Sequence, residues 1–571
     1  MEKIKKLKKT FIEEKIDGYL IPKNDEFFDE YLPLYNDRLN YISNFSGSYG
    51  FSLILKNNNY LFVDGRYTLQ AVKQSGTFFK IITFSNFTPS DILKKGKYLI
   101  GYDPKLFTNK TLNIFSNKNI NLKPIKDNLI DKIWKRKSRL NGIKFYTLPK
   151  KSVGENLKSK INKVIKNLKN TDADYQFISS SENNAWLFNI RGKDSKYSPI
   201  PHCYALVEKN SKINFFCDLK KTSLSFRKKL KKVKFHDIKY TEKILSKINK
   251  KSFLVDKNSC SIFFEQIIKK NNKIINFNDP IYNLKAIKNR NEIRNIKLAH
   301  KYDGAALTKY LFWIKKNFYK RKITEISASK KLLSFRQKNK KFKFSSFPTI
   351  SGTGPNGAII HYKASKKSNR VLKKGDVYLV DSGGQYEFGT TDVTRTISLK
   401  NSDKRIKDIF TRVLKGHIAV SSFQLKDNTS GSEIDTQARK YLKKIGLNYS
   451  HGTGHGVGYF LNVHEGPQAI SKNNKIRFQE GMVVSNEPGY YEKNKFGIRI
   501  ENLIYVKKEK TKKFFENLTL APIDKELIDK NVLSKKEKNW LNSYHHKVYK
   551  NLKRSMNKIE IKELKKACSA I

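Results

Sequence analysis

Hydrophobic and polar positions follow the same order in two stretches of the first half of the chain. A short apolar run, at 18–22 and again at 175–178, ends in a polar cluster. An aromatic-containing segment that stops at a glycine follows, and then two more apolar runs. This order predicts a strand, a sharp turn, a helix and two paired strands in each stretch. Lysine-rich segments at 5–15 and 155–170 precede them and are expected to form helices with solvated lysines. We therefore expect two α/β domains with mixed sheets.

The second half of the chain opens with a helical pattern. Apolar residues at helical spacing predict one long amphipathic helix that packs on a sheet; they are Ile293, Ile296, Ala299, Ala306, Tyr310 and Trp313. Further helices are predicted at 323–337 and 405–421, with paired strands between them. His300 lies in the first helix and is interpreted as structural. The chain ends in a lysine-rich helical tail, interpreted as packing or dimer surface, in which the adjacent His545 and His546 point in different directions.

The length of 571 residues exceeds what one hydrophobic core normally holds. We expect two α/β domains at 1–135 and 150–285, a mixed α/β domain at 288–515 and a helical extension at 516–571. The fold class is therefore α/β (α+β).

The charge of the chain is strongly positive, with a formal net value of +65 and a pI of about 10.0. Such values suggest a polyanion as partner, but a nucleic-acid footprint should cluster on one face or in one tail. Here lysines are spread over almost every segment, and Arg395 is the only basic residue between Asp376 and Ile397. We interpret the charge as compositional bias and expect no specific nucleic-acid partner.

The cysteines and the N-terminal segment favour a reducing compartment. Cys203, Cys217, Cys260 and Cys568 form no CxxC pair, which predicts free thiols. The N-terminus has no apolar core of a signal peptide and lacks the arginines of a mitochondrial presequence. No apolar stretch reaches the length of a membrane span. We expect a soluble, cytoplasmic protein without a membrane partner.

Five candidate metal ligands lie in four short motifs towards the C-terminal end. Four carboxylates and one imidazole make an oxygen-rich site, which suits a pair of divalent cations of the manganese class better than a thiolate-rich zinc site. Two such cations can share a hydroxide and hold both ends of a hydrolytic displacement. The pattern therefore predicts a metallohydrolase, and the ligands are Asp381, Asp392, His455, Glu487 and Glu501.

The spacing of the carboxylates predicts two hairpins. Asp381 ends one alternating run and Asp392 opens the next, so two antiparallel strands joined around 387–389 should set them roughly opposite each other. A second hairpin that turns at Asn494 should set Glu487 across from Glu501. Cross-strand neighbours have Cβ atoms about 4.5–5.5 Å apart, close enough to share metal ions.

These motifs resemble those of the pita-bread metallopeptidases, and specifically the Xaa-Pro aminopeptidases (aminopeptidase P) in their longer, three-domain cytosolic form. The resemblance covers nearly the whole chain and rests on VDGRYTLQA (63–71), NAWLFNIRGKD (184–194), SFPTISGTGPNGAIIHY (346–362), HGTGHGVGYFLNVHEGP (451–467) and NEPGYYEKNKFGIRIEN (486–502). It implies two creatinase-type N-terminal domains, a pita-bread catalytic domain, a helical C-terminal tail and a homodimer.

The resemblance also assigns the metal ligands. Asp392 and Glu501 correspond to the two residues that bridge the metals in this family. Asp381 corresponds to a ligand of one metal, and His455 and Glu487 to ligands of the other. No ligand position is substituted, so an active enzyme with two divalent ions, most simply Mn²⁺, is expected.

The implied activity is hydrolysis of the bond between an N-terminal residue and a proline in second position. Attack by a metal-bound hydroxide is expected, with Glu487 as proton acceptor. His361, His451 and His464 match family positions that contact substrate without binding metal. We expect His361 and His464 to stabilise the oxyanion, and His451 to contact substrate or brace the glycine-rich loop. Arg499 is expected to orient a carboxylate or the substrate.

Two alternatives share these motifs. A prolidase has the same ligand set and accepts only dipeptides, but two full N-terminal domains favour the aminopeptidase. Some pita-bread domains have become binding modules for histones or nucleic acid. Such modules typically lose ligands, and this chain keeps all five.

Overall fold

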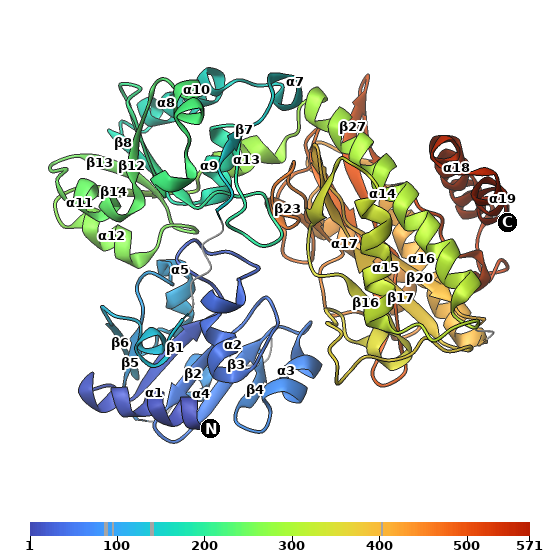
Figure 1. The fold of residues 1–571 in the computed structure, drawn as a ribbon, viewed down its shortest axis with the longest axis horizontal. Helices are drawn as coiled ribbons and strands as arrows, with labels where there is room; N and C mark the ends of the chain where they lie inside the picture. Colours follow the sequence, from blue (N-terminus) through green and yellow to red (C-terminus); the bar gives the residue numbers. More distant parts are fainter. Residues whose placement is uncertain (85–88, 94–95, 137–141, 401–402) are drawn as a thin grey trace. The chain divides into compact units, whose positions relative to one another are not determined.

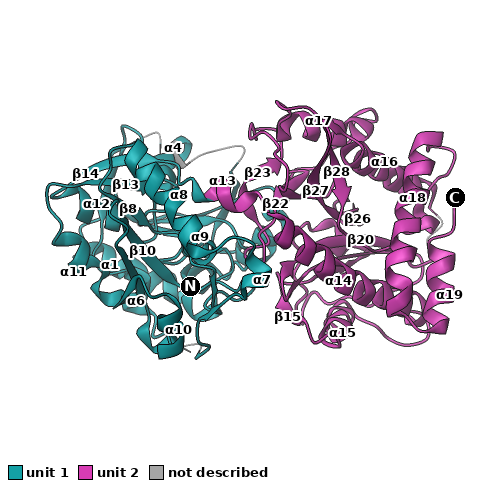
Figure 2. Ribbon diagram, turned by 90° about the horizontal axis from the view of Figure 1, so that it is seen from above, with its two compact units in different colours: residues 1–281 teal, residues 282–571 magenta. Residues whose placement is uncertain are grey.

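The computed structural model describes residues 1–84, 89–93, 96–136, 142–400 and 403–571. The chain forms two compact units, residues 1–281 and residues 282–571, drawn in teal and magenta in Figure 2. Helices and strands alternate along both units, as expected (Figure 1). Within the described parts of the chain, no helix is both long and apolar enough to cross a membrane.

Unit 1 contains two six-stranded sheets with equivalent strand orders. The first sheet runs β4-β3-β2-β1-β5-β6, with β1 (Gly18–Pro22), β2 (Phe51–Leu55), β3 (Asn59–Val63), β4 (Lys80–Thr83), β5 (Tyr98–Tyr102) and β6 (Ile120–Pro124). The second runs β12-β11-β10-β8-β13-β14, with β8 (Tyr175–Ile178), β10 (Cys203–Glu208), β11 (Ile213–Cys217), β12 (Val233–Asp237), β13 (Ser252–Asp256) and β14 (Lys273–Phe277).

The strand pairing confirms the predicted internal repeat. Strand β1 pairs antiparallel with β2 and parallel with β5, and β8 pairs in the same two ways with β10 and β13. The short helices of the repeats are α2 (Arg38–Ser43) and α9 (Ser181–Leu187). The remaining helices and short strands of unit 1 are α3 (Thr68–Ser75), α4 (Pro89–Ile92), α5 (Asn109–Leu112), α6 (Leu129–Ile133), α7 (Lys150–Val153), α10 (Leu224–Lys229), α11 (Thr241–Ser246), α12 (Ile262–Lys269), β7 (Tyr146–Thr147) and β9 (Ile190–Arg191).

The lysine-rich segments form helices α1 (Glu2–Glu13) and α8 (Leu157–Asn170), each with a buried apolar stripe. The expectation that their lysines are solvated is wrong for Lys160. Its side chain is buried, and its ammonium donates to the carbonyl of Trp186 at 2.8 Å and to Oδ1 of Asn189 at 2.7 Å. Two hydrogen bonds and the Trp186 ring at 3.7 Å replace the water that this ammonium would lose. The four cysteines are free thiols, as predicted.

The helices of unit 2 follow the sequence pattern closely. The predicted long helix is α14 (Arg290–Asn317), and its core face packs on β17 and β20. Tyr310 is buried on this face and Ile296 is also buried, whereas Ile293 and Trp313 are partly buried. The other α-helices described in this unit are α13 (Ile281–Ala286), α15 (Glu325–Gln337), α16 (Lys404–Ser421), α17 (Gly431–Lys443), α18 (Lys535–Leu552) and α19 (Lys558–Ala567), of which α13 and α17 were not predicted.

The described part of unit 2 also contains three sheets and a hairpin. Their orders are β16-β17-β20, β15-β18-β19, β21-β28-β27-β24-β22-β23 and β25-β26. The strands are β15 (Phe342–Ser345), β16 (Ile350–Thr353), β17 (Val377–Ser382), β18 (Gly384–Tyr386), β19 (Gly389–Thr390), β20 (Val393–Ser398), β21 (Gln424–Leu425), β22 (Gly454–Gly456), β23 (Glu465–Ile470), β24 (Val483–Asn486), β25 (Gly489–Glu492), β26 (Phe496–Arg499), β27 (Asn502–Glu509) and β28 (Lys512–Asn517).

Two histidines outside the predicted site, His300 and His545, are buried structural residues. His300 is buried, and its Nδ1 lies 2.8 Å from the carbonyl oxygen of Ile296 one turn earlier. Burial lowers the pKa of His300 to about 4, so the ring is neutral. In the helical tail His545 is buried and accepts the N–H of Ile523, whereas His546 is exposed. The two rings therefore point apart, as predicted.

Candidate metal centre

The two aspartates lie on neighbouring antiparallel strands, as predicted, but not directly opposite each other. Asp381 is in β17 and is paired with Thr394 of β20, and Asp392 directly precedes β20. Asp392 is therefore a diagonal neighbour of Asp381, two residues along the ladder. The connection is also longer than a simple turn, because it contains β18 and β19, which form a separate sheet with β15.

Glu487 and Glu501 face each other between two ladders that share one register. Asn486 pairs with Asn502 in β24–β27, and Gly489 pairs with Arg499 in the hairpin β25–β26. Continuing either ladder sets Glu487 across from Glu501, as predicted. The hairpin turns at Asn494, which has φ of 62°. Asparagine tolerates this left-handed conformation better than most residues.

His455 stands in β22, and its ring reaches two of the carboxylates. Nε2 of His455 lies 3.4 Å from Oδ2 of Asp392 and 3.5 Å from Oε1 of Glu487. One ligand atom each of Asp392, His455 and Glu501 lie within 4.8 Å of one another. Ligands that share one ion with bonds of about 2.1 Å are roughly 3–3.5 Å apart. The spacings from His455 to Asp392 and from His455 to Glu487 therefore fit ligands of a common ion.

The electrostatics of the cluster call for cations. Burial raises the pKa of Asp392 well above its usual range, and Asp381 and Glu487 raise it further by repulsion. The pKa of Glu501 is also well above its usual range, through burial and the charges of Asp392 and Glu487. Oδ1 of Asp381 and Oδ1 of Asp392 are buried and have no hydrogen-bond partner in the described part of the chain. Buried oxygens without a donor are rare unless an ion or water takes that place. The donor set fits divalent ions.

Neighbouring side chains hold these ligands in position. The guanidinium of Arg499 donates to Oδ2 of Asp381 at 2.7 Å and to the hydroxyl of Thr394 at 3.0 Å. Thr394 in turn donates to Oε2 of Glu501 at 2.7 Å. On the other side of the cluster, the hydroxyl of Ser485 donates to Oε1 of Glu487 and accepts the N–H of His455.

Three histidines predicted to contact substrate occupy different positions. The ring of His464 lies edge-on to His455, with centroids 4.3 Å apart. Nε2 of His451 lies 2.9 Å from the hydroxyl of Tyr491, to which Arg499 donates at 2.7 Å. His451 is thus connected through Tyr491 and Arg499 to the candidate ligand Asp381. His361 lies, half-buried, on the loop that follows β16.

Sequence reasoning missed Thr394, Ser485 and Tyr491. Thr394 and Ser485 each stand two residues from a ligand, on the same side of a strand, and this period-two position is a usable signal. Tyr491 gave no such signal, because its contact with His451 joins residues far apart in the chain.

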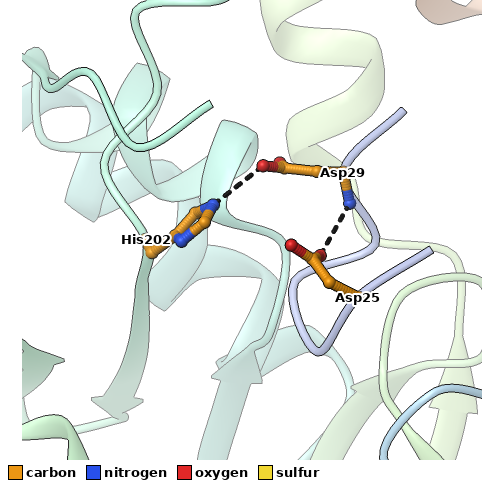
Figure 3. Close-up of side chains that lie close together, drawn as sticks. All are labelled: Asp25, Asp29 and His202. Atoms are coloured by element: carbon orange, nitrogen blue, oxygen red, sulfur yellow. Dashed lines mark hydrogen bonds and ion pairs between the residues drawn. The ribbon is translucent and has the colours of Figure 1, made fainter. Parts of the chain in front are cut away.

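Unit 1 contains a second group of acids and a histidine that the sequence did not suggest. Figure 3 shows His202 facing Asp29, with Nε2 at 2.8 Å from Oδ2. Both oxygens of the buried Asp25 already accept hydrogen bonds, from the N–H groups of Phe27 and Asp29 and from the amide of Asn36. A spacing of 2.8 Å is a hydrogen bond rather than the separation of two metal ligands. We interpret this group as a buried ion pair, not a metal site.

Charge controls the protonation of this group. Burial by itself would lower the pKa of His202, but Asp29 and Asp25 raise it to about 9. Burial raises the pKa of Asp25 to about 7, and the charge of Asp29 contributes. Near neutral pH the His202 ring is therefore a cation held by Asp29.

Comparison with known proteins relates the whole chain to one group of enzymes. Residues 294–508 match metallopeptidase family M24, residues 3–133 and 136–292 each match a creatinase/prolidase N-terminal domain, and residues 514–571 match the C-terminal region of peptidase M24.

Individual relatives agree with these matches. A probable Xaa-Pro aminopeptidase P of Laccaria bicolor is 37% identical over 95% of this chain and 89% of its own length. Xaa-Pro aminopeptidase 1 of Dictyostelium discoideum is 35% identical over 96% of this chain and 92% of its own. The crystal structure of an X-prolyl aminopeptidase of Caenorhabditis elegans matches with a TM-score of 0.95 and 32% identity. The match covers 100% of this chain and 99% of the C. elegans chain. That protein is described as a cytosolic enzyme with a di-nuclear active site.

Proposed function

The chain belongs to the Xaa-Pro aminopeptidases of metallopeptidase family M24, and on this premise we propose how its residues remove an N-terminal residue that precedes proline. The fold has the expected parts, two creatinase-type N-terminal domains and a pita-bread catalytic domain. The protein is a metal-dependent aminopeptidase. The observation that carries the proposed site is the cluster of Asp392, His455 and Glu501, whose ligand atoms converge within 4.8 Å.

Two divalent metal ions serve this reaction, and we propose Mn²⁺. Asp392 and Glu501 would bridge the ions, Asp381 would bind one of them, and His455 and Glu487 would bind the other. The buried oxygens of Asp381 and Asp392 that lack a hydrogen-bond partner among the described residues support this assignment. When bound, such ions lower the pKa of a water molecule and polarise the scissile carbonyl.

The side chains around the ligands would carry the proton and the developing charge. Glu487, oriented by the hydroxyl of Ser485, accepts the proton of the attacking water. A new C–O bond forms at the carbonyl of the first residue, and the C–N bond to proline breaks. The proton passes from Glu487 to the proline nitrogen, which leaves as an amine. His361 and His464 donate to the carbonyl oxygen as its charge increases.

Substrate binding would use the remaining residues. The free N-terminal amine lies close to Asp381, whose carboxylate is held by Arg499. Proline in second position has no amide N–H and a fixed φ, so the pocket needs no acceptor for that position. We propose that His451, which Tyr491 orients, supports the substrate on this side.

The test is hydrolysis of a Xaa-Pro-Xaa peptide beside the Xaa-Pro dipeptide, with Mn²⁺ added. Cleavage of the longer peptide after its first residue supports the proposal. Exclusive cleavage of the dipeptide indicates a prolidase. No cleavage, with tight salt-sensitive binding of nucleic acid, indicates a binding module.

Several further points stay predictions. We propose a homodimer, which sedimentation would test, and a cytoplasmic location, which the cytosolic C. elegans relative supports. We also retain the four-part division at 1–135, 150–285, 288–515 and 516–571. Absence of a specific nucleic-acid partner is likewise a prediction.

A further inference from the structure

Glu325 is a fully buried carboxylate in unit 2 that takes no part in the reaction proposed above. It is the first residue of α15, where the positive end of the helix favours a negative charge. Thr324 caps this helix by accepting the N–H of Ser327. Glu325 is therefore held on a rigid element, and its backbone N–H donates to the carbonyl of Arg370 at 3.0 Å.

Donors from one loop converge on this carboxylate. Oε1 accepts the N–H of Thr353 at 2.9 Å, and Oε2 accepts the N–H of Arg370 at 2.9 Å. The hydroxyl of Tyr362 lies 2.8 Å from Oε2, and the amide of Asn356 lies 3.0 Å from both oxygens. These donors are neutral amide and hydroxyl groups, so the carboxylate acts as a common acceptor rather than as half of an ion pair.

These donors are spread along the loop that carries His361. Thr353 stands where the loop leaves β16, and Asn356 lies in its first turn. Arg370 lies near the end of the loop, where the chain passes the first residue of α15. Tyr362, the residue after His361, is fixed to Glu325 in the middle of the loop. One side chain therefore closes the loop and holds its centre.

A close backbone contact fixes the opposite side of the same loop. A Cβ built on Gly497 would lie 1.8 Å from the carbonyl oxygen of Gly357, so strand β26 can approach the first turn of the loop this closely only because residue 497 is glycine. Strand β26 ends at Arg499, which binds Asp381. The loop is thus held between α15 and the strand next to the metal ligands.

We propose that Glu325 is the positioning residue for His361: it sets the conformation of the loop that brings this imidazole to the scissile carbonyl. This inference rests on the role of His361 in the proposed function. It assigns the buried carboxylate a part in catalysis without contact with substrate or metal. Catalytic groups on loops act only when the scaffold holds them to a fraction of an ångström.

Glu325→Gln is the variant that tests this role. It keeps the size of the side chain but turns one acceptor into a donor. That donor must face at least one of the amide or hydroxyl donors of the loop, so at least one hydrogen bond is lost and the loop moves. Tyr362→Phe is a milder second variant that removes only the hydroxyl between the loop centre and Oε2. The matched control is Glu537→Gln, which alters another buried glutamate in the first turn of a helix, α18.

The experiment is a double-mutant cycle on kcat with His361→Ala, together with metal content. We expect Glu325→Gln to lower kcat about 10- to 100-fold, since misplacing a catalytic group by about 1 Å costs on the order of 100-fold. Both metal ions should be retained. In the His361→Ala background the same substitution should change kcat less than about 3-fold, because the group it positions is gone. Tyr362→Phe should act in the same direction. Any change in kcat caused by Glu537→Gln should be the same fold-change with and without His361→Ala.

A readout other than activity separates this inference from the proposed function. The side-chain NMR resonances of His361, assigned with His361→Ala, should shift in Glu325→Gln and stay in place in Glu537→Gln. If they shift while His361→Ala leaves kcat unchanged, the positioning stands and the catalytic role of His361 fails. Unshifted resonances, or losses in kcat that multiply in the double variant, overturn the inference.

Discussion

The guanidinium of Arg499 binds one oxygen of Asp381 at 2.7 Å and leaves the other oxygen, Oδ1, without a hydrogen-bond partner among the described residues. One oxygen of the carboxylate is therefore fixed by Arg499, and the other is left to bind a different partner. This division is what a metal ligand requires, because one oxygen fixes the orientation and the second can bind the ion.

Arg499→Lys should impair metal binding more than folding. Lysine has a single compact ammonium in place of a planar fork, so it cannot serve Asp381, Tyr491 and Thr394 together. We expect a 10- to 100-fold loss in metal affinity or activity, the range typical of residues that orient ligands. Titration with Mn²⁺, followed by activity and calorimetry, measures it. Unchanged affinity and activity would refute a role of Arg499 in orienting the ligand.

Asp392→Asn should lower the metal content and abolish activity while the fold persists. Asp392 is a proposed bridging ligand, so loss of its charge would leave less negative charge to balance the two cations, and at least one should dissociate. Elemental analysis of the purified variant gives the stoichiometry, and circular dichroism checks the fold. Full activity with two ions retained would remove Asp392 from the site.

The metal-free protein should become less stable as pH rises. The pKa of Asp392 in the folded protein is well above its unfolded value near 3.8, and the same direction holds for Glu501. Protonated carboxyls therefore favour the fold fully below pH of about 4, and this contribution is lost as pH rises through the folded pKa values. The free energy of unfolding of the metal-free protein, measured with denaturant at several pH values, should fall as pH rises. Asp392→Asn should make this fall smaller. A flat profile contradicts this prediction.

His464→Ala should keep both metal ions and lose turnover. His464 lies against His455 but has the proposed role of stabilising charge in the transition state. Removing one such donor typically costs about 100- to 1,000-fold in kcat. Steady-state kinetics beside metal analysis separates the two effects, and loss of a metal ion would instead make His464 a support for His455.

Acetylation of the substrate should abolish cleavage. A free amine can pair with the carboxylates of the cluster, and acetylation removes that charge and adds bulk. Replacing proline in second position by alanine should slow the reaction, because the pocket then meets an amide N–H without a designed acceptor. Mass spectrometry of the products decides both points, with the free Xaa-Pro-Xaa peptide as control. Equal cleavage of acetylated and free peptides would exclude an aminopeptidase.

The ion pair of unit 1 gives a separate pH dependence. The pKa of His202 rises to about 9 in the fold from an unfolded value near 6.5. The stability it contributes is therefore complete below pH of about 6.5 and is lost as pH rises through 9. We expect a loss on the order of 1–3 kcal/mol. The free energy of unfolding of unit 1, measured with urea at several pH values, should show this loss, and His202→Gln should remove it. An unchanged loss in the variant would show that another group titrates.

The sequence predicted the candidate metal ligands because each stands in a short motif whose strand pattern sets its register. It also revealed the repeat of unit 1, since apolar runs and glycines recur in the same order. The contacts between distant residues escaped it. Asp29 and His202 meet across a separation of 173 residues, and neither stands in a periodic pattern that points to the other. Lys160 looked like any exposed lysine, because only the tertiary fold brings Trp186 and Asn189 to it.

The shared register on both sides of Glu487 and Glu501 limits how this gene can change in length. Residues can be added at the tip near Asn494, which lies beyond the last residue pair of the β25–β26 ladder. A single-residue deletion between Glu487 and that tip would slip the hairpin by one position and turn side chains to the opposite face of the strand. Insertions and deletions in this segment should therefore survive in descendants only at the turn, or as matched pairs, one on each strand.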